Sequence, residues 1–187
     1  MVITAASQVT ETDLPNARLG SRFGRLDLMS QMALLAVEKL GLNFDSLPRE
    51  RIAICLVAKA GSLATDVEFW KGRDALGGPS PTLFAYTLPS AAIGEIAIRH
   101  RLTGPNLCFV GDSGDVLPEA VDLLRRGEAD ACVCLYCQVV SAEAGQLIQS
   151  TSVSSVCALF LQRAGIGQIV ADEFDRDMES ACAKFRA

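Results

Sequence analysis

The chain has 187 residues, 50% of them hydrophobic, which is enough apolar material for one substantial core. Its formal net charge is −5 and it has no run of basic residues, so we expect neither a nucleic-acid nor a membrane partner. The seven cysteines lie mostly within apolar runs, which favours buried thiols over a disulfide framework. With no signal-peptide pattern at the start, we expect a cytoplasmic protein.

The first half of the chain alternates predicted strands and helices. A strand is expected over residues 2–5. Apolar residues then recur at helical spacing, which predicts a helix that Ser21 caps and Gly41 ends. The segment 51–59 is a continuous apolar run rich in branched residues, as in a strand that is covered on both faces of a parallel sheet.

The second half continues this alternation. Its predicted elements are a helix from Ser90, a short strand at 106–111, a helix at 118–127, a buried strand at 129–140, two closing strands at 152–164 and 166–174, and a terminal helix at 176–186. The closing strands follow each other without a helix, so that edge should be antiparallel. The expected fold is therefore α/β, with a mainly parallel five-stranded sheet, an antiparallel edge strand and helices on both faces.

Two segments carry a resemblance to a known family. They read SPTLFAYTLPSAAIGEIAIRHRLTGPN and AVDLLRRGEAD, and together they resemble the N-terminal lobe of β-ketoacyl synthases, in the thiolase-like superfamily. The likeness extends over roughly residues 1–172, with shortened loops. It implies that residues 1–187 form a single thiolase-like lobe.

The resemblance also implies a site from which the sulfur has been lost. The family's first lobe carries a nucleophilic cysteine at a strand-to-helix corner, and counting from Gly104–Asn106 this place is held by Ser113. The family's second lobe supplies two histidines, and the chain shows no counterpart of it. The resemblance therefore implies a non-condensing protein, a structural or regulatory partner in fatty-acid or polyketide-type biosynthesis.

The residues around Ser113 argue against a working nucleophile. Asp112 and Asp115 flank it, and neighbouring carboxylates disfavour an alkoxide. Pro118 should delay the start of the next helix and so relax the corner. The only histidine, His100, lies between two arginines that disfavour its charged form, which makes it a poor candidate for the base that a serine needs.

No cofactor or metal site is expected. Cys132 and Cys134 should face one side of a strand and Cys137 the other, and no histidine cluster accompanies them. The glycine-rich segment 77–81 lacks the Lys and Ser/Thr ending of a phosphate-binding loop.

The short strand before Ser113 is the expected partner-binding edge. In the family this strand pairs with its copy in a dimer, and the matching residues here are Leu107, Cys108, Phe109 and Val110. A bare apolar edge of this kind invites pairing with another strand. We therefore expect a homodimer, or a heterodimer with a full ketosynthase. Arg125 and Arg126 could contact an acyl carrier protein, although a solvated helix end is the simpler interpretation.

Two other functions stay open at this point. One is an acyl transferase or hydrolase that uses Ser113. The other is an acyl-binding module whose pocket is formed by Phe84, Tyr86 and Leu88.

Overall fold

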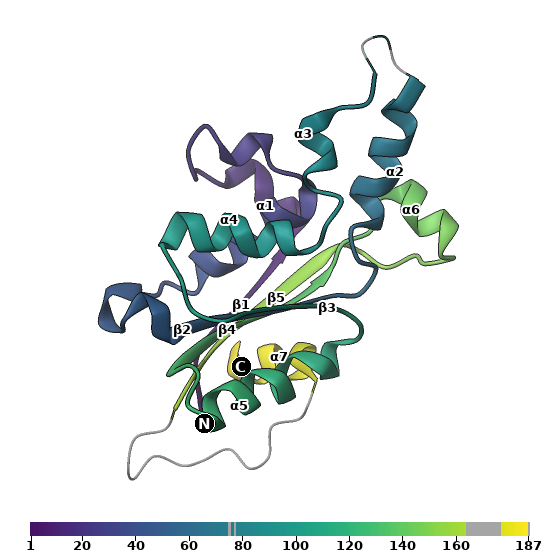
Figure 1. Ribbon diagram of the computed structural model, residues 1–187. Helices are drawn as coiled ribbons and strands as arrows, with labels where there is room; N and C mark the ends of the chain where they lie inside the picture. Colours follow the sequence, from purple (N-terminus) through teal and green to yellow (C-terminus); the bar gives the residue numbers. More distant parts are fainter. Residues whose placement is uncertain (75, 77, 164–176, 187) are drawn as a thin grey trace.

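The computed structural model describes residues 1–74, 76, 78–163 and 177–186, and its centre is one five-stranded sheet (Figure 1). The strand order is β1-β5-β4-β2-β3. The strands are β1 (Val2–Thr10), β2 (Ile52–Ala58), β3 (Asn106–Val110), β4 (Ala131–Gln138) and β5 (Ser155–Gln162). The expected α/β class is confirmed.

Strand directions follow the expected mixed pattern, with one difference in position. β2 pairs in parallel with both β3 and β4, whereas β5 is antiparallel to β4 and to β1. The reversed strand β5 therefore lies one place inside the sheet, and β1 forms the edge beside it. The second closing strand that we predicted, at 166–174, lies outside the described residues.

Helices cover both faces of the sheet and produce two cores. α1 (Leu28–Lys39) and α4 (Ser90–His100) pack on one face, and α5 (Val116–Arg125) and α7 (Met178–Arg186) on the other (Figure 1). Side chains of β2 and β4 alternate between these cores, and every residue of β2 is buried. That burial explains why both strands read as continuous apolar runs.

A third group of helices extends from one end of the sheet, and we call it the helical arm. It consists of α2 (Leu63–Lys71), α3 (Pro81–Phe84) and α6 (Ala142–Leu147) (Figure 1). The rings of Phe69 and Phe84 lie 5.5 Å apart, and Lys71 pairs with Glu143 at 2.7 Å. Large apolar side chains that are exposed on the arm and its connections are Trp70, Leu76, Phe84, Leu88, Leu147 and Ile148.

Two predicted helix starts are wrong. α1 is capped by Asp27, whose Oδ1 accepts from the Ser30 N–H at 3.1 Å, and not by Ser21. α5 begins at Val116, so Pro118 stands in the first turn, where a helix does not need its N–H, and Leu117 is helical. The predicted start of α4 at Ser90 is confirmed.

No helix in the described ranges is long and apolar enough to cross a membrane.

Candidate functional site

The corner between β3 and α5 is tight, contrary to the relaxed corner that we expected from Pro118. A single 3-10 turn, Ser113–Asp115, joins the end of β3 to α5. The Asp112 N–H donates to Asp115 Oδ2 at 2.9 Å, and a Cβ on Gly111 would lie 2.4 Å from the same oxygen. Glycine at 111 therefore lets the Asp115 carboxylate fold back and close the turn.

Ser113 is engaged as a hydrogen-bond donor. Its hydroxyl donates to Oδ1 of Asp177, the residue just before α7. Oδ2 of Asp177 accepts from the N–H and the hydroxyl of Ser180, at 3.2 and 2.7 Å. The hydrogen bond from the Ser113 hydroxyl is the largest cause that holds the pKa of Asp177 below its ordinary value. The bond from the Ser180 hydroxyl is the second. A carboxylate with a lowered pKa is a weak base, so this contact fastens α7 to the corner without activating the serine.

The described charged groups around the corner are carboxylates that act on Tyr136. Burial raises the pKa of Tyr136 to about 12, and the carboxylates of Glu179, Asp112 and Asp177 add to the rise. The same negative field acts against charge that would develop on the Ser113 oxygen. Within the described residues, this field disfavours Ser113 as a nucleophile.

His100 lies at the wrong end of the fold to serve Ser113. It is the last residue of α4, which leads into the start of β3, whereas Ser113 follows the end of that strand. Its ring lies 4.8 Å from that of Phe44, and burial lowers its pKa. Because the chain has no other histidine, Ser113 has no imidazole partner.

The thiols are arranged as the strand pattern predicts. Cys132 and Cys134 lie in the core beneath α5, and Cys137 lies in the core beneath α1. Burial raises the pKa of Cys132 and Cys137 well above the ordinary thiol value, which disfavours the thiolates that bind metals. Over the described ranges, no group of three or more His, Cys, Asp or Glu side chains is placed to hold a metal ion.

The four β3 residues that we expected at an interface form the open edge of the sheet. Leu107, Cys108 and Phe109 are half-buried and Val110 is 68% exposed. β3 pairs with β2 on one side, and no strand pairs with its other side within the described residues.

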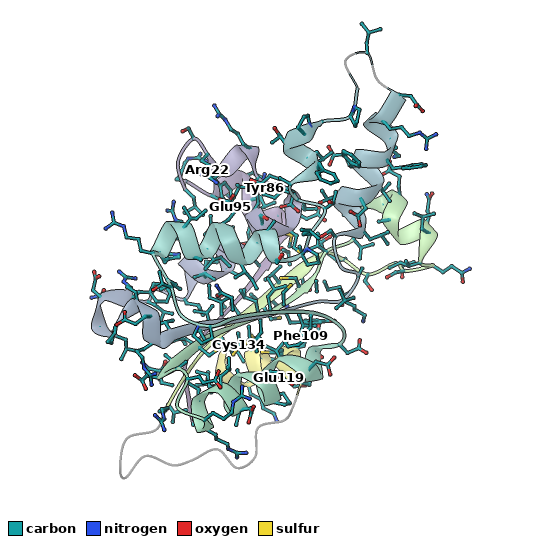
Figure 2. The ribbon with its side chains drawn as sticks, viewed as in Figure 1. Arg22, Tyr86, Glu95, Phe109, Glu119 and Cys134 are labelled. Atoms are coloured by element: carbon teal, nitrogen blue, oxygen red, sulfur yellow. The ribbon has the colours of Figure 1, made fainter. Side chains whose placement is uncertain are left out.

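The three candidate residues for an acyl pocket do not converge. Phe84 and Leu88 are 62% and 63% exposed on the helical arm and its connection to α4. Tyr86 is half-buried and donates to Glu95 Oε1 at 3.1 Å, and the same oxygen accepts from Arg22 at 2.8 Å (Figure 2). The Tyr86 hydroxyl is thus committed to a polar contact with α4.

Sequence reasoning missed a hollow between β3 and α5. It has a volume of about 270 Å³ and is lined in part by Phe109 and Glu119, which are both labelled in Figure 2. Its other lining residues are Val110, Asp115 and Pro118. Asp115, the residue just before α5, and Glu119 in its first turn are four residues apart, and this spacing was the signal available in the sequence.

Comparison with known proteins identifies the fold. No protein-family model matches the chain, and no curated protein matches it. Many solved structures do match, at low sequence identity but with TM-scores that show a shared fold, and three of them are described below. The ishigamide ketosynthase/chain length factor is 18% identical with a TM-score of 0.72, over 89% of this chain and 63% of that one. The chain thus spans less than two thirds of that protein chain.

Two further structures give the same result. The ketosynthase ApeO in complex with its chain length factor ApeC, from Xenorhabdus doucetiae, is 16% identical with a TM-score of 0.64, over 88% of this chain and 79% of that one. AntDE:AntF, a type II PKS acyl-carrier protein in complex with its ketosynthase bound to the hexaketide, is 14% identical with a TM-score of 0.70, over 87% and 62%. The chain therefore has the thiolase-like fold of ketosynthase/chain length factor proteins.

The contact between Ser113 and Asp177 leads to a first prediction. Ser113→Ala should lower the free energy of unfolding by about 1 kcal/mol and speed amide exchange in α7, because a hydrogen bond to a carboxylate is lost. Since the pKa of Asp177 is lowered in the folded state, this stabilisation is present above its ordinary value of 3.8 and is lost as pH falls through the lower folded value.

Denaturant unfolding at pH 7 and pH 3 checks this prediction. The difference between the variant and the parent protein should be smaller at pH 3. Ser152→Ala, in an exposed loop, serves as the matched control and should leave α7 unchanged. Equal stabilities at pH 7 would show that Ser113 does not hold α7.

Proposed function

We propose that this chain is a non-condensing ketosynthase-like protein that acts as a structural or regulatory partner of a ketosynthase in fatty-acid or polyketide-type biosynthesis. The observation that carries the proposal is the open outer edge of β3, directly beside a corner that is unsuited to nucleophilic chemistry. Two of the structural neighbours support it, since each is a ketosynthase described together with a chain length factor.

The backbone of β3 is well placed for pairing with a further strand. The Pro105 carbonyl accepts from the Ile54 N–H at 2.9 Å and the Gly111 N–H donates to the Ala58 carbonyl at 3.4 Å, so odd-numbered residues bond inward to β2. Because backbone groups alternate along a strand, those of Asn106, Cys108 and Val110 point outward. These outward groups are free to form a ladder with a partner strand.

The helical arm adds apolar surface near the same edge. The Cβ position of Gly61, just before α2, lies within 4 Å of both Val110 and Pro89. The end of β3 is therefore in contact with the base of the arm, where Leu88 is exposed. An apolar surface that continues from a sheet edge is typical of a protein interface.

Other features fit a partner role in a reducing compartment, which we take to be the cytoplasm. All seven cysteines are free thiols. Arg126 pairs with Asp122 at 3.2 Å and Glu128 at 3.0 Å, so its charge is already balanced within the chain. Of the two arginines considered for contact with an acyl carrier protein, Arg125 is the better candidate.

We further propose that residues 1–187 form a single lobe in this role.

A proline substitution in β3 tests the proposal. Val110→Pro removes one outward N–H and leaves the inward bonds to β2 intact, so it should weaken strand pairing about tenfold or more while the chain still folds. Val110→Thr keeps the N–H and serves as the control. A ketosynthase is co-expressed with each variant, and light scattering after size exclusion gives the mass and composition of the complex.

The possible outcomes distinguish the candidate functions. A heterodimer that Val110→Pro disrupts supports the proposal, whereas a pure homodimer with the same sensitivity would support self-pairing through β3. A stable monomer that does not bind the ketosynthase would contradict both the heterodimer and self-pairing through β3. A covalent acyl adduct from acyl thioesters that Ser113→Ala abolishes would instead establish acyl transfer, and melting shifts with acyl ligands alone would indicate an acyl-binding module.

A further inference from the structure

A polar cavity lies at the opposite end of β3 from Ser113. Its volume is about 460 Å³, within the range of small-molecule sites. Its lining residues are Leu42, Asn43, Phe44, Asp45, Arg49, Arg99, His100 and Arg101. They come from the segment after α1, the segment before β2 and the end of α4. We propose that this cavity binds the phosphate or diphosphate group of a small molecule.

The charges of the lining carry the proposal. Three guanidinium groups and one carboxylate give it a net charge of +2, in a chain whose overall charge is −5. Arg49 is held by its bonds to the His100 carbonyl at 2.7 Å and to Asp45 at 2.6 Å. Arg99 pairs with Glu38, which is not among the lining residues. Guanidinium groups on a rigid frame suit the planar, two-point recognition of phosphate oxygens.

Arg101 is the group left over for a ligand. In the described part of the chain it makes no hydrogen bond or ion pair, whereas Arg49 and Arg99 both have partners. Its φ is 55°, in the left-handed region that favours glycine at the end of a helix. Arginine is thus present where glycine would relieve the backbone. A cation at a neighbouring position with an ordinary φ would interact with the helix dipole equally well. The helix dipole alone therefore does not explain an arginine at position 101.

His100 provides a second unused group in the same cavity. Its Nε2 is buried and makes no hydrogen bond within the described residues, with the Glu38 carboxylate 3.6 Å away. Burial is the largest cause of its lowered pKa; Glu38 raises that pKa, and Arg99 and Arg49 lower it further. A bound dianion would offset the guanidinium charges and so raise the His100 pKa. The imidazole should therefore respond directly to occupancy of the cavity.

The lone histidine makes the experiment specific, because its ring signals in NMR report on this cavity and nowhere else. Inorganic phosphate and diphosphate are titrated into the full chain at constant ionic strength. We expect saturable shifts of the His100 ring signals and a higher His100 pKa in the complex, with diphosphate binding more tightly than phosphate.

Arg101→Gly separates binding from stability. It should raise the Tm by about 2–4 °C, because the left-handed position is relieved, and weaken diphosphate binding by about tenfold. Arg25→Ala removes an exposed positive charge that does not line the cavity and should leave the affinity unchanged. Three results would overturn the proposal: no saturable shift at millimolar diphosphate, full affinity in Arg101→Gly, or an equal loss in Arg25→Ala.

Discussion

Gly104→Ala should lower the free energy of unfolding by about 3 kcal/mol, which corresponds to a fall in Tm of about 6–12 °C for a chain of this size. The segment before β3 crosses the start of β2 so closely that a Cβ at 104 would lie 2.3 Å from the Ile52 carbonyl oxygen and 2.7 Å from its carbon. These are backbone atoms of a buried internal strand, which cannot rotate away as a flexible side chain would. Thermal and denaturant unfolding measure the loss.

Gly94→Ala is the matched control for this experiment. Gly94 lies inside α4, and no atom stands within 4 Å of the position of its Cβ. Alanine there should be neutral or should stabilise the protein by up to about 1 kcal/mol, because it restricts the unfolded chain and favours the helix. If Gly104→Ala were as stable as Gly94→Ala, the close approach of the two segments would be wrong.

Gly104 also shows which sequence patterns carry structural meaning. It belongs to the Gly-Pro-Asn segment used in the resemblance, and the close crossing supplies a physical reason for a residue without a side chain at this point. The buried strands β2 and β4 and the two faces of Cys132 and Cys137 were equally predictable, because side-chain alternation is a local property.

Long-range contacts were not predictable in the same way. β1 pairs with β5 across most of the chain, Val9 lying opposite Val156, and no local pattern specifies that partner. The bond from Ser113 to Asp177 spans 64 positions and depends on where α7 packs. The start of α5 was mispredicted because proline restricts the preceding residue only on average, whereas packing against β2 and β4 fixes Leu117 as helical here.

The candidate site was therefore predicted in part. The sequence indicated a corner with acidic neighbours and an apolar strand before it, and the structure shows that corner and that open edge. Nothing in the sequence indicated that Asp177 would accept a hydrogen bond from the Ser113 hydroxyl. Nor did it indicate that the guanidinium groups of Arg49, Arg99 and Arg101 would line one cavity. Both arrangements join elements that are distant in the sequence.

Asp27 joins two elements through a buried carboxylate, and its replacement should have a comparably large effect. It is 8% exposed, Oδ1 caps α1 through the Ser30 N–H, and Oδ2 accepts from the hydroxyl of Thr65 in α2 at 3.0 Å. Asp27→Ala removes the cap and leaves a buried hydroxyl without its acceptor. The free energy of unfolding should fall by about 2–4 kcal/mol.

Two further variants determine how the loss divides. Asp27→Asn retains a capping oxygen, and its amide can donate to the Thr65 hydroxyl, so it should lose less than about 1 kcal/mol. Adding Thr65→Val to Asp27→Ala removes the stranded hydroxyl and should restore part of the stability, which denaturant unfolding of the double-mutant cycle measures. Because α2 belongs to the helical arm, amide exchange should also rise in α2 when Asp27 is lost. Strictly additive effects of the two substitutions would mean that Asp27 caps α1 without holding the arm.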